Sequence, residues 1–436
     1  MKNTTKIIFS ALIVLAGMFS TQPVKATDGY FGVGYGAQNK GLAGAGIAWY
    51  QNSLISGNPA GHVFLGTQYQ VGVGFFNPNR EYTIGNGSDM SMFKLAPGTV
   101  ESDSKLFLMP SMGANWMINE KSSFSATMFG NGGMNTDYPT NTFLDPNSST
   151  TGVDLGQMFV GLTYSRKITE KHSFGVTALL AYQYFEAKGL GMFGAMGMSS
   201  DADKLTDNGH DNAFGYGVKF GYLGELAKGL HLGASYQTML YMSEFDDYAG
   251  LFAEQGDFNI PSTWTVGLAY EINEDWAVMA DYKAINYTDV ASVSNPLDMS
   301  IASPVGFDAM GNMFPNPNFK GLGDDAGAGF GWEDIGVIKF GVEYAGIEGW
   351  TLRGGYSHCD QPIQKSEVMF NMLAPGVIED HITLGCSKTL GDTGKALHLA
   401  LVYAMPASVK GYNPMDPSQS IEIEMNQIEV EIAFTF

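Results

Sequence analysis

The chain has 436 residues and a formal net charge of −21 at pH 7, which disfavours binding to nucleic acid. Hydrophobic residues make up 44% of it and 56 residues are Gly, but no stretch after the N-terminus is long and apolar enough for a transmembrane helix. This composition indicates β structure. Cys359 and Cys386 are too few for a disulfide framework, and the sequence leaves one bridge or two thiols open.

The N-terminus has the pattern of a secretory signal peptide. Lys2 and Lys6 precede an apolar run over residues 7–19, and a small-residue cleavage pattern ends at Ala26. The run falls short of the roughly 20 apolar residues that a transmembrane anchor needs. The sequence therefore predicts a signal peptide over residues 1–26 and export from the cytoplasm.

The next stretch, residues 27–61, is rich in Gly and Ala and does not alternate as a membrane strand does. It has short helical potential from Gly41 to Leu54. A pore as wide as a barrel of about 14 strands leaks unless something fills it. We therefore expect residues 27–61 to form a small hatch, or plug, inside a lumen, with a periplasmic tail as the alternative interpretation.

From residue 62 to the end, large apolar residues alternate with Gly, Thr, Ser or charged residues. Clear examples are "TQYQVGVGF" (67–75), "MFVGLTYS" (158–165), "FGYGVKFGYL" (214–223), "STWTVGLAYEI" (262–272), "IKFGVEYA" (338–345) and "LHLALVY" (397–403). This period of two is typical of a wall with lipid or core on one side and a polar interior on the other.

The connections between these stretches alternate between short and long. Tight polar turns are predicted near 119–122, 167–172, 227–230, 273–276, 346–350 and 390–394. Longer links are predicted at about 78–104, 136–152, 188–212, 246–258, 290–332, 360–379 and 407–419. Strict alternation places all long loops at one end and all short turns at the other, so residues 62–436 are predicted to form an all-β, 14-stranded antiparallel transmembrane barrel.

The last stretch, "IEVEIAFTF", alternates up to the final residue, Phe436. Its apolar face is expected to meet lipid, and the strand is expected to pair with the first one, because an unpaired sheet edge is not tolerated in a membrane. A terminal Phe also resembles the signal that barrel-assembly machinery recognises.

Several motifs resemble those of one family. "GYGAQNKGLAGAGIA" and "SLISGNPAGH" are similar to the N-terminal hatch of the FadL/TodX family of outer-membrane channels, which import long-chain fatty acids and other hydrophobic compounds. "MFGNGGMNTDY" (128–138), "WTLRGGYSHCDQPI" (350–363) and "LAPGVIEDHITLG" (373–385) also match, so the resemblance covers essentially the whole mature chain.

The resemblance implies a monomeric barrel whose hatch blocks straight passage and whose ligand leaves sideways through an inward kink in the third strand. The hatch motif would be Asn58, Pro59, Ala60 and Gly61. The kink would be Gly130, Asn131, Gly132 and Gly133. Independently of the resemblance, three glycines in four residues favour a bulge, with close packing inside the barrel as the alternative.

Several predicted loops are unusually apolar. The candidates for capturing a hydrophobic ligand are Met192, Phe193, Met196, Met198, Met369, Phe370, Met372 and Leu373. Methionine is flexible and polarizable, which suits a surface that accepts variable shapes. Packing of the loops against one another explains the same composition, and both interpretations can hold.

Strand parity places Lys283, Lys339 and Arg353 on the lumen side of consecutive predicted strands. A buried carboxylate needs cations or several donors to offset its desolvation, so these three residues are candidates for binding a carboxylate headgroup. Ion pairs that brace the barrel interior are the alternative.

The sequence thus predicts a Gram-negative-type outer-membrane channel that imports hydrophobic small molecules by passive diffusion, with hatch gating and lateral exit. A surface adhesin or receptor scaffold and a general porin are the alternatives. The expected partners are a hydrophobic ligand, outer-membrane lipid or lipopolysaccharide, and barrel-assembly machinery through Phe436, with no nucleic acid. No catalytic residue, metal or cofactor is predicted.

Overall fold

A computed structural model describes residues 28–436, apart from 56, 92, 309 and 392–393. The predicted signal peptide over residues 1–26 lies outside the described residues. Most of the described chain is antiparallel β-sheet.

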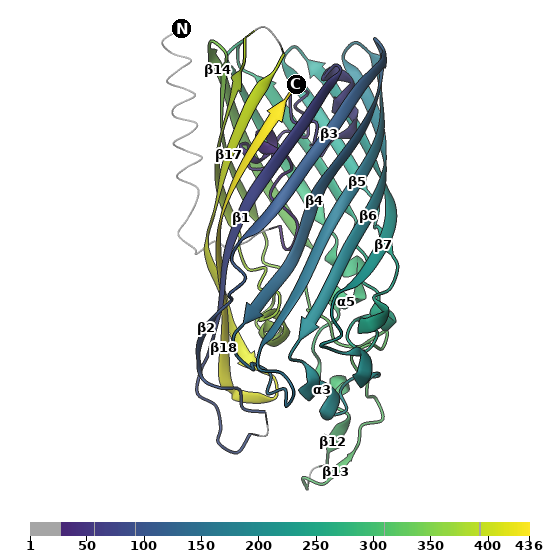
Figure 1. Ribbon diagram of the computed structural model, residues 1–436, viewed down its shortest axis with the longest axis vertical. Coiled ribbons are helices and arrows are strands. Elements are labelled where there is room, and N and C mark those ends of the chain that lie inside the picture. Colours follow the sequence, from purple (N-terminus) through teal and green to yellow (C-terminus); the bar gives the residue numbers. More distant parts are fainter. Residues whose placement is uncertain (1–27, 56, 92, 309, 392–393) are drawn as a thin grey trace.

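Within the described residues, 14 long strands form one sheet that closes on itself, because the last strand pairs with the first. These strands are β1 (Gln68–Ile84), β3 (Phe107–Asn119), β4 (Ser122–Tyr138), β5 (Thr151–Thr169), β6 (His172–Lys188), β7 (Asp211–Ala227), β8 (Leu230–Gln237), β10 (Thr263–Glu271), β11 (Trp276–Ile285), β14 (Ile335–Ile347), β15 (Trp350–Cys359), β16 (Asp380–Thr389), β17 (Ala396–Asn413) and β18 (Asp416–Thr435). Each pairs with the next along the chain, and Figure 1 shows them as one tilted cylinder. The predicted 14-stranded antiparallel barrel is confirmed.

The remaining elements are short. The extra strands are β2 (Gly98–Glu101) beside β1, β9 (Tyr241–Met242) beside β7, and the hairpin of β12 (Val305–Phe307) and β13 (Met313–Pro315). The helices are α2 (Ala37–Lys40), η1 (Pro59–Phe64), α3 (Gly191–Ala195), η2 (Ala202–Lys204), η3 (Asp246–Tyr248), α4 (Ala253–Gly256), η4 (Tyr287–Asp289), α5 (Ala291–Ser294), α6 (Met299–Ala302) and α7 (Val368–Asn371). Among the described helices, none has the length and apolarity needed to span a membrane.

Long connections gather at one end of the cylinder, where α3 and the β12–β13 hairpin project, and the C-terminus lies at the opposite end (Figure 1). One predicted long link is wrong: β17 and β18 continue through 407–419 and turn between Asn413 and Asp416. A register shift between Ala404 and Ala407 surrounds Pro406, which cannot donate to the ladder. The residues that follow this shift are partly polar, so the apolar alternation stops there although β17 and β18 remain paired.

The two faces of the wall differ as the alternation predicts. On β18, Ile428 and Ile432 are 44% and 43% exposed on the outside, whereas Glu429 and Glu431 are buried on the inside. Cross-strand neighbours of the same parity, such as Leu399 opposite Ile432, extend this apolar band. An apolar outer face with a polar inner face is the arrangement of a barrel in lipid.

Residues 28–66, called the N-terminal segment below, lie within the cylinder, where their purple ribbon runs behind the strands in Figure 1. α2 contacts β16, β17 and β18, while η1 contacts β4, β5, β6 and β7. The segment therefore reaches widely separated parts of the inner wall. Most of its side chains are buried.

Candidate functional site

The hydrogen-bond ladder between β3 and β4 has a gap, which is called the window below. The ladder between these strands ends at the Ser111–Phe129 pair, and the described residues of β4 beyond Phe129 have no partner in β3. The first residues of β3 pair with β1 alone. At the outer end the window closes again, because Asp103 N donates a hydrogen bond to Asp137 O at 2.8 Å.

The predicted kink residues lie at the inner border of this window. Register between β4 and β5 shifts between Gly130 and Gly132, so Asn131 has no ladder partner in β5 and forms a bulge. The Asn131 side chain instead donates to Gln157 Oε1 at 2.9 Å and accepts from Tyr35 OH at 2.7 Å. The bulge thus ties the wall to the N-terminal segment.

The N-terminal segment occupies part of the window by pairing with β4 where β3 does not. Gly32 N donates to Asn131 O and Gly133 N donates to Tyr30 O, both at 3.2 Å. A Cβ at Gly132 would lie 1.7 Å from Tyr30 O, so only glycine allows this approach. The contact supplies backbone hydrogen bonds that the missing strand would otherwise make.

Arg80 of β1, which the sequence analysis did not single out, bridges the outer part of the window. Its guanidinium donates to Asn135 O of β4 and Ser104 O of the β2–β3 link. The side chain is buried. Arg80 is the only basic residue of β1, and this was the available signal.

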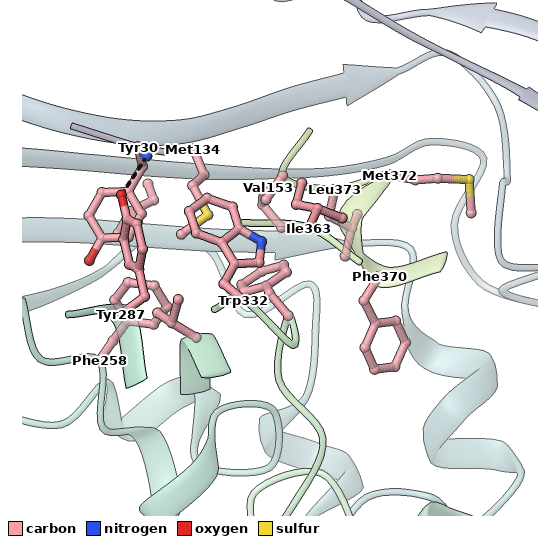
Figure 2. Packing of buried hydrophobic residues seen from close by; sticks show 14 of the residues in the cluster. Tyr30, Met134, Val153, Phe258, Tyr287, Trp332, Ile363, Phe370, Met372 and Leu373 are labelled. Carbon is pink, nitrogen blue, oxygen red and sulfur yellow. Dashed lines mark hydrogen bonds between the residues drawn. The ribbon is translucent and has the colours of Figure 1, made fainter. Parts of the chain in front are cut away.

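Aromatic side chains of the N-terminal segment and of the loops form a cluster at the loop end of the segment. Tyr30 N donates to Tyr287 OH at 3.2 Å, and Trp332 packs edge-on against Tyr287 with ring centroids 5.0 Å apart (Figure 2). Phe31 and Phe258 also contact Tyr30. This aromatic layer separates the lumen from the loops.

An almost wholly apolar cavity lies among the loops beyond the aromatic layer. Its lining includes Val153, Phe185, Phe193, Phe252, Phe330 and Phe370. Figure 2 shows Phe370 and Leu373 on the loop side of Trp332. Such a lining suits an apolar ligand.

The predicted capture residues pack mainly inside this loop region. Phe193, Met198, Met369, Phe370, Met372 and Leu373 are buried, whereas Met192 is partly buried and Met196 is exposed. Most of these residues therefore pack the loops against one another, which was the alternative to ligand capture. Three of the eight, Phe193, Phe370 and Leu373, also line the apolar cavity.

The structure brings two of the three carboxylate-binding candidates together. Lys283 Nζ of β11 and Lys339 Nζ of β14 each lie 3.0 Å from Asp28 Oδ2. Burial opposes ionisation of Asp28, but the two ammonium groups outweigh it and hold the pKa of Asp28 below its ordinary value. Arg353 of β15 lies elsewhere and binds Glu343 at 2.8 Å.

A polar cavity adjoins this charge cluster. Lys219, Asp281, Lys283 and Lys339 line it together with backbone of the N-terminal segment, including Gly44. No group of three or more metal-binding side chains occurs among the described residues. Cys359 and Cys386 are not joined by a disulfide bond.

The predicted hatch motif, residues 58–61, attaches the N-terminal segment to the wall at β7. Asn58 caps η1 by accepting from Ala60 N at 3.0 Å, and its amide donates to Ile47 O and to Tyr222 O of β7. Pro59 starts the helix, where its missing N–H costs nothing. Asn58 thus links the turn around Ile47, the start of η1 and strand β7.

Two further contacts anchor η1. Ala60 O accepts from the hydroxyl groups of Ser165 in β5 and Ser173 in β6. His62 shares a 2.8 Å hydrogen bond with Ser125 of β4. Burial lowers the pKa of His62 to about 4, so this side chain stays neutral near pH 7.

A closed barrel with an apolar outer face, long loops at one end and a chain segment in its lumen defines an outer-membrane β-barrel protein. The chain belongs to the family described as outer membrane protein transport protein (OMPP1/FadL/TodX), whose model matches residues 33–371. No curated protein matches the chain.

Solved structures share the fold. The toluene transporter TodX of Pseudomonas putida has a TM-score of 0.64 at 18% identity, covering 93% of this chain and 98% of that one. The Ralstonia pickettii toluene transporter TbuX gives 0.57 at 17% identity, and a Pseudomonas aeruginosa FadL homologue gives 0.62 at 12%, each over 93% of this chain and 98% of its own.

Proposed function

We propose that this protein lets hydrophobic small molecules cross the outer membrane by passive diffusion, entering among the loops and leaving sideways between β3 and β4. The observation that carries the proposal is the window in the wall, part of which three residues of the N-terminal segment occupy in place of a strand. The toluene transporters TodX and TbuX, which share the fold, support a hydrophobic substrate such as an aromatic hydrocarbon. A long-chain fatty acid is the other substrate class that the proposal includes.

A lateral exit fits the chemistry of such a substrate. An apolar molecule gains about 25 cal/mol for each Å² that it removes from water, so it prefers the bilayer to the periplasm. The N-terminal segment, as a hatch, blocks the axial route through its attachments to β4–β7 and β16–β18. Passage then needs only a local movement of Tyr30–Gly32 rather than removal of the whole segment.

The test is uptake of radiolabelled oleate and toluene by cells that lack their own channels. Cells would express the wild type, a variant lacking the bulge residue Asn131, or Gly354→Ala. Deleting Asn131 should restore regular pairing of β4 and reduce uptake to the empty-vector level. Gly354→Ala is the matched control, because the nearest atom to its new Cβ is an ordinary 3.6 Å away.

Each outcome has a distinct meaning when a heat-modifiable band verifies the folded barrel. Unchanged uptake without Asn131 would contradict the lateral route. Failure of the wild type to import either probe would contradict hydrophobic transport and favour a receptor scaffold. Large ion and sugar conductance of the wild type would favour a general porin.

A further inference from the structure

The pair of lysines in the lumen already holds a carboxylate, and that carboxylate belongs to the chain itself. Asp28 is 1% exposed, and its Oδ2 atom accepts hydrogen bonds from Lys283 and Lys339 at 3.0 Å each. Lys339 also donates to Val33 O at 2.6 Å. Two ammonium groups converging on one oxygen form a built anion site.

The adjoining cavity is lined by a third lysine, Lys219. Lys219 makes no hydrogen bond or ion pair with any residue that the structure describes. The second acid, Asp281, uses Oδ2 to accept from Ile47 N, and its Oδ1 has no partner in the described chain. Counted by residue type, three lysines face two aspartates, so one further anion would balance the formal charge of the cavity.

The same few residues connect Asp28 to the window. Tyr287 OH donates to Asp28 O at 2.6 Å and accepts from Tyr30 N. Lys283 Nζ lies 5.0 Å from the centre of the Phe31 ring. Phe31 itself bridges to Gly132 in the window. Displacement of Asp28 would therefore disturb the contacts that hold Tyr30–Gly32 against β4.

We propose that Asp28 is an internal stand-in for a ligand carboxylate: an amphiphile with one carboxylate head and an apolar tail displaces it from Lys283 and Lys339 and so releases Tyr30–Gly32 from the window. The inference rests on the proposed function, to which it adds the ligand class and the trigger for release. The tail lies toward Phe31, a residue of the aromatic layer that lines the same cavity as the lysines. Lys219 offers the displaced Asp28 a new counter-ion.

The energetics favour a carboxylate over a neutral ligand. Exchange of one carboxylate for another keeps both lysines neutralised, whereas a neutral molecule that displaced Asp28 would leave two buried ammonium groups unpaired. A carboxylate ligand therefore opens the window at a lower cost than an alcohol with the same tail.

Binding of two matched probes to the full-length protein in detergent tests the proposal. Radiolabelled laurate and dodecanol share the tail length, and equilibrium dialysis measures each affinity. Asp28→Asn should raise laurate affinity roughly tenfold, because the internal competitor loses its charge, and should leave dodecanol affinity unchanged. Asp281→Asn changes an acid of the same cavity that accepts a hydrogen bond from Ile47 N and from neither lysine, so it should raise laurate affinity less.

The rate of backbone hydrogen exchange measures the release of Tyr30–Gly32 from the window independently of ligand affinity. Laurate should speed exchange in peptides that cover residues 28–36 and 128–138, whereas dodecanol should not. Asp28→Asn should show fast exchange without ligand, and Asp28→Glu should restore the wild-type pattern, since it keeps the carboxylate. A heat-modifiable band verifies that each variant is folded.

The outcomes separate this inference from the transport proposal. If laurate and dodecanol bind alike and Asp28→Asn changes neither affinity, Asp28 is a structural brace and the inference fails while transport stands. Laurate binding without faster exchange at 28–36 also overturns it. If neither probe binds and uptake of oleate and toluene is absent too, both proposals fail.

Discussion

The ammonium of Lys40 lies inside the barrel between two carboxylates of β18. It binds Glu429 and, at 2.6 Å, Glu431, and all three side chains are buried. Burial opposes the charge of Lys40, but the two carboxylates outweigh it and raise its pKa, so it stays protonated. Lys40→Ala would leave two buried carboxylates facing each other without a cation.

We expect Lys40→Ala to weaken the attachment of the N-terminal segment by roughly 3–5 kcal/mol, the usual cost of an unpaired buried charge. Local hydrogen exchange over residues 37–45 measures this loss. Lys171→Ala is the control, because Lys171 is exposed and a surface pair such as the one it forms with Glu225 adds little to stability. Equal protection in both variants would contradict the bracing role of Lys40.

Strand parity places Lys283 and Lys339 on the inner face, but it does not reveal what they bind. Their partner, Asp28, is 255 and 311 residues away in the sequence and lies two residues beyond the predicted signal peptide, where no periodic pattern exists. Arg353 has the same parity, yet its register places it opposite Glu343. Parity fixes the face of a residue, whereas its partner depends on register and on the path of the N-terminal segment.

The short helix η1 contacts the wall where glycines leave room for it. A Cβ at Gly175 of β6 would lie 2.4 Å from the backbone of Pro59. Gly175→Ala should therefore push η1 away from the wall and raise ion conductance in planar bilayers. Gly354→Ala adds the same methyl group to the wall without a close contact, so its conductance should equal that of the wild type. If Gly175→Ala conducts no better, η1 does not seal the lumen.

Among the elements, alternation predicts strands well where one face meets lipid. It fails in the outer parts of β17 and β18, where a bulge at Pro406 and polar residues hide the continued pairing. The "GNGG" sequence predicts a weak point, and the register shift falls between Gly130 and Gly132. The sequence could not predict that Tyr30–Gly32 pairs with β4 at this point, because backbone hydrogen bonds depend little on side-chain composition.

Closure of the whole barrel joins the two ends of the chain's β structure, and Phe436 lies at this seam. Its backbone exchanges two hydrogen bonds of 2.9 Å with Tyr69, and its half-exposed ring stacks on Tyr69 at 5.5 Å. Phe436→Ala keeps the backbone pair and loses an outward-facing ring, so we expect little change in the thermal stability of barrel that has already folded.

We expect the same substitution to lower the amount of folded barrel in the outer membrane severalfold, because a terminal aromatic residue would guide assembly before the seam closes. Phe434→Ala is the matched control, since Phe434 lies two residues before Phe436 and its ring stacks against that of Phe436. The heat-shifted band of isolated outer membranes measures abundance, and the temperature at which the shift is lost measures stability. A loss of stability as large as the loss of abundance would assign Phe436 to the seam itself rather than to its assembly.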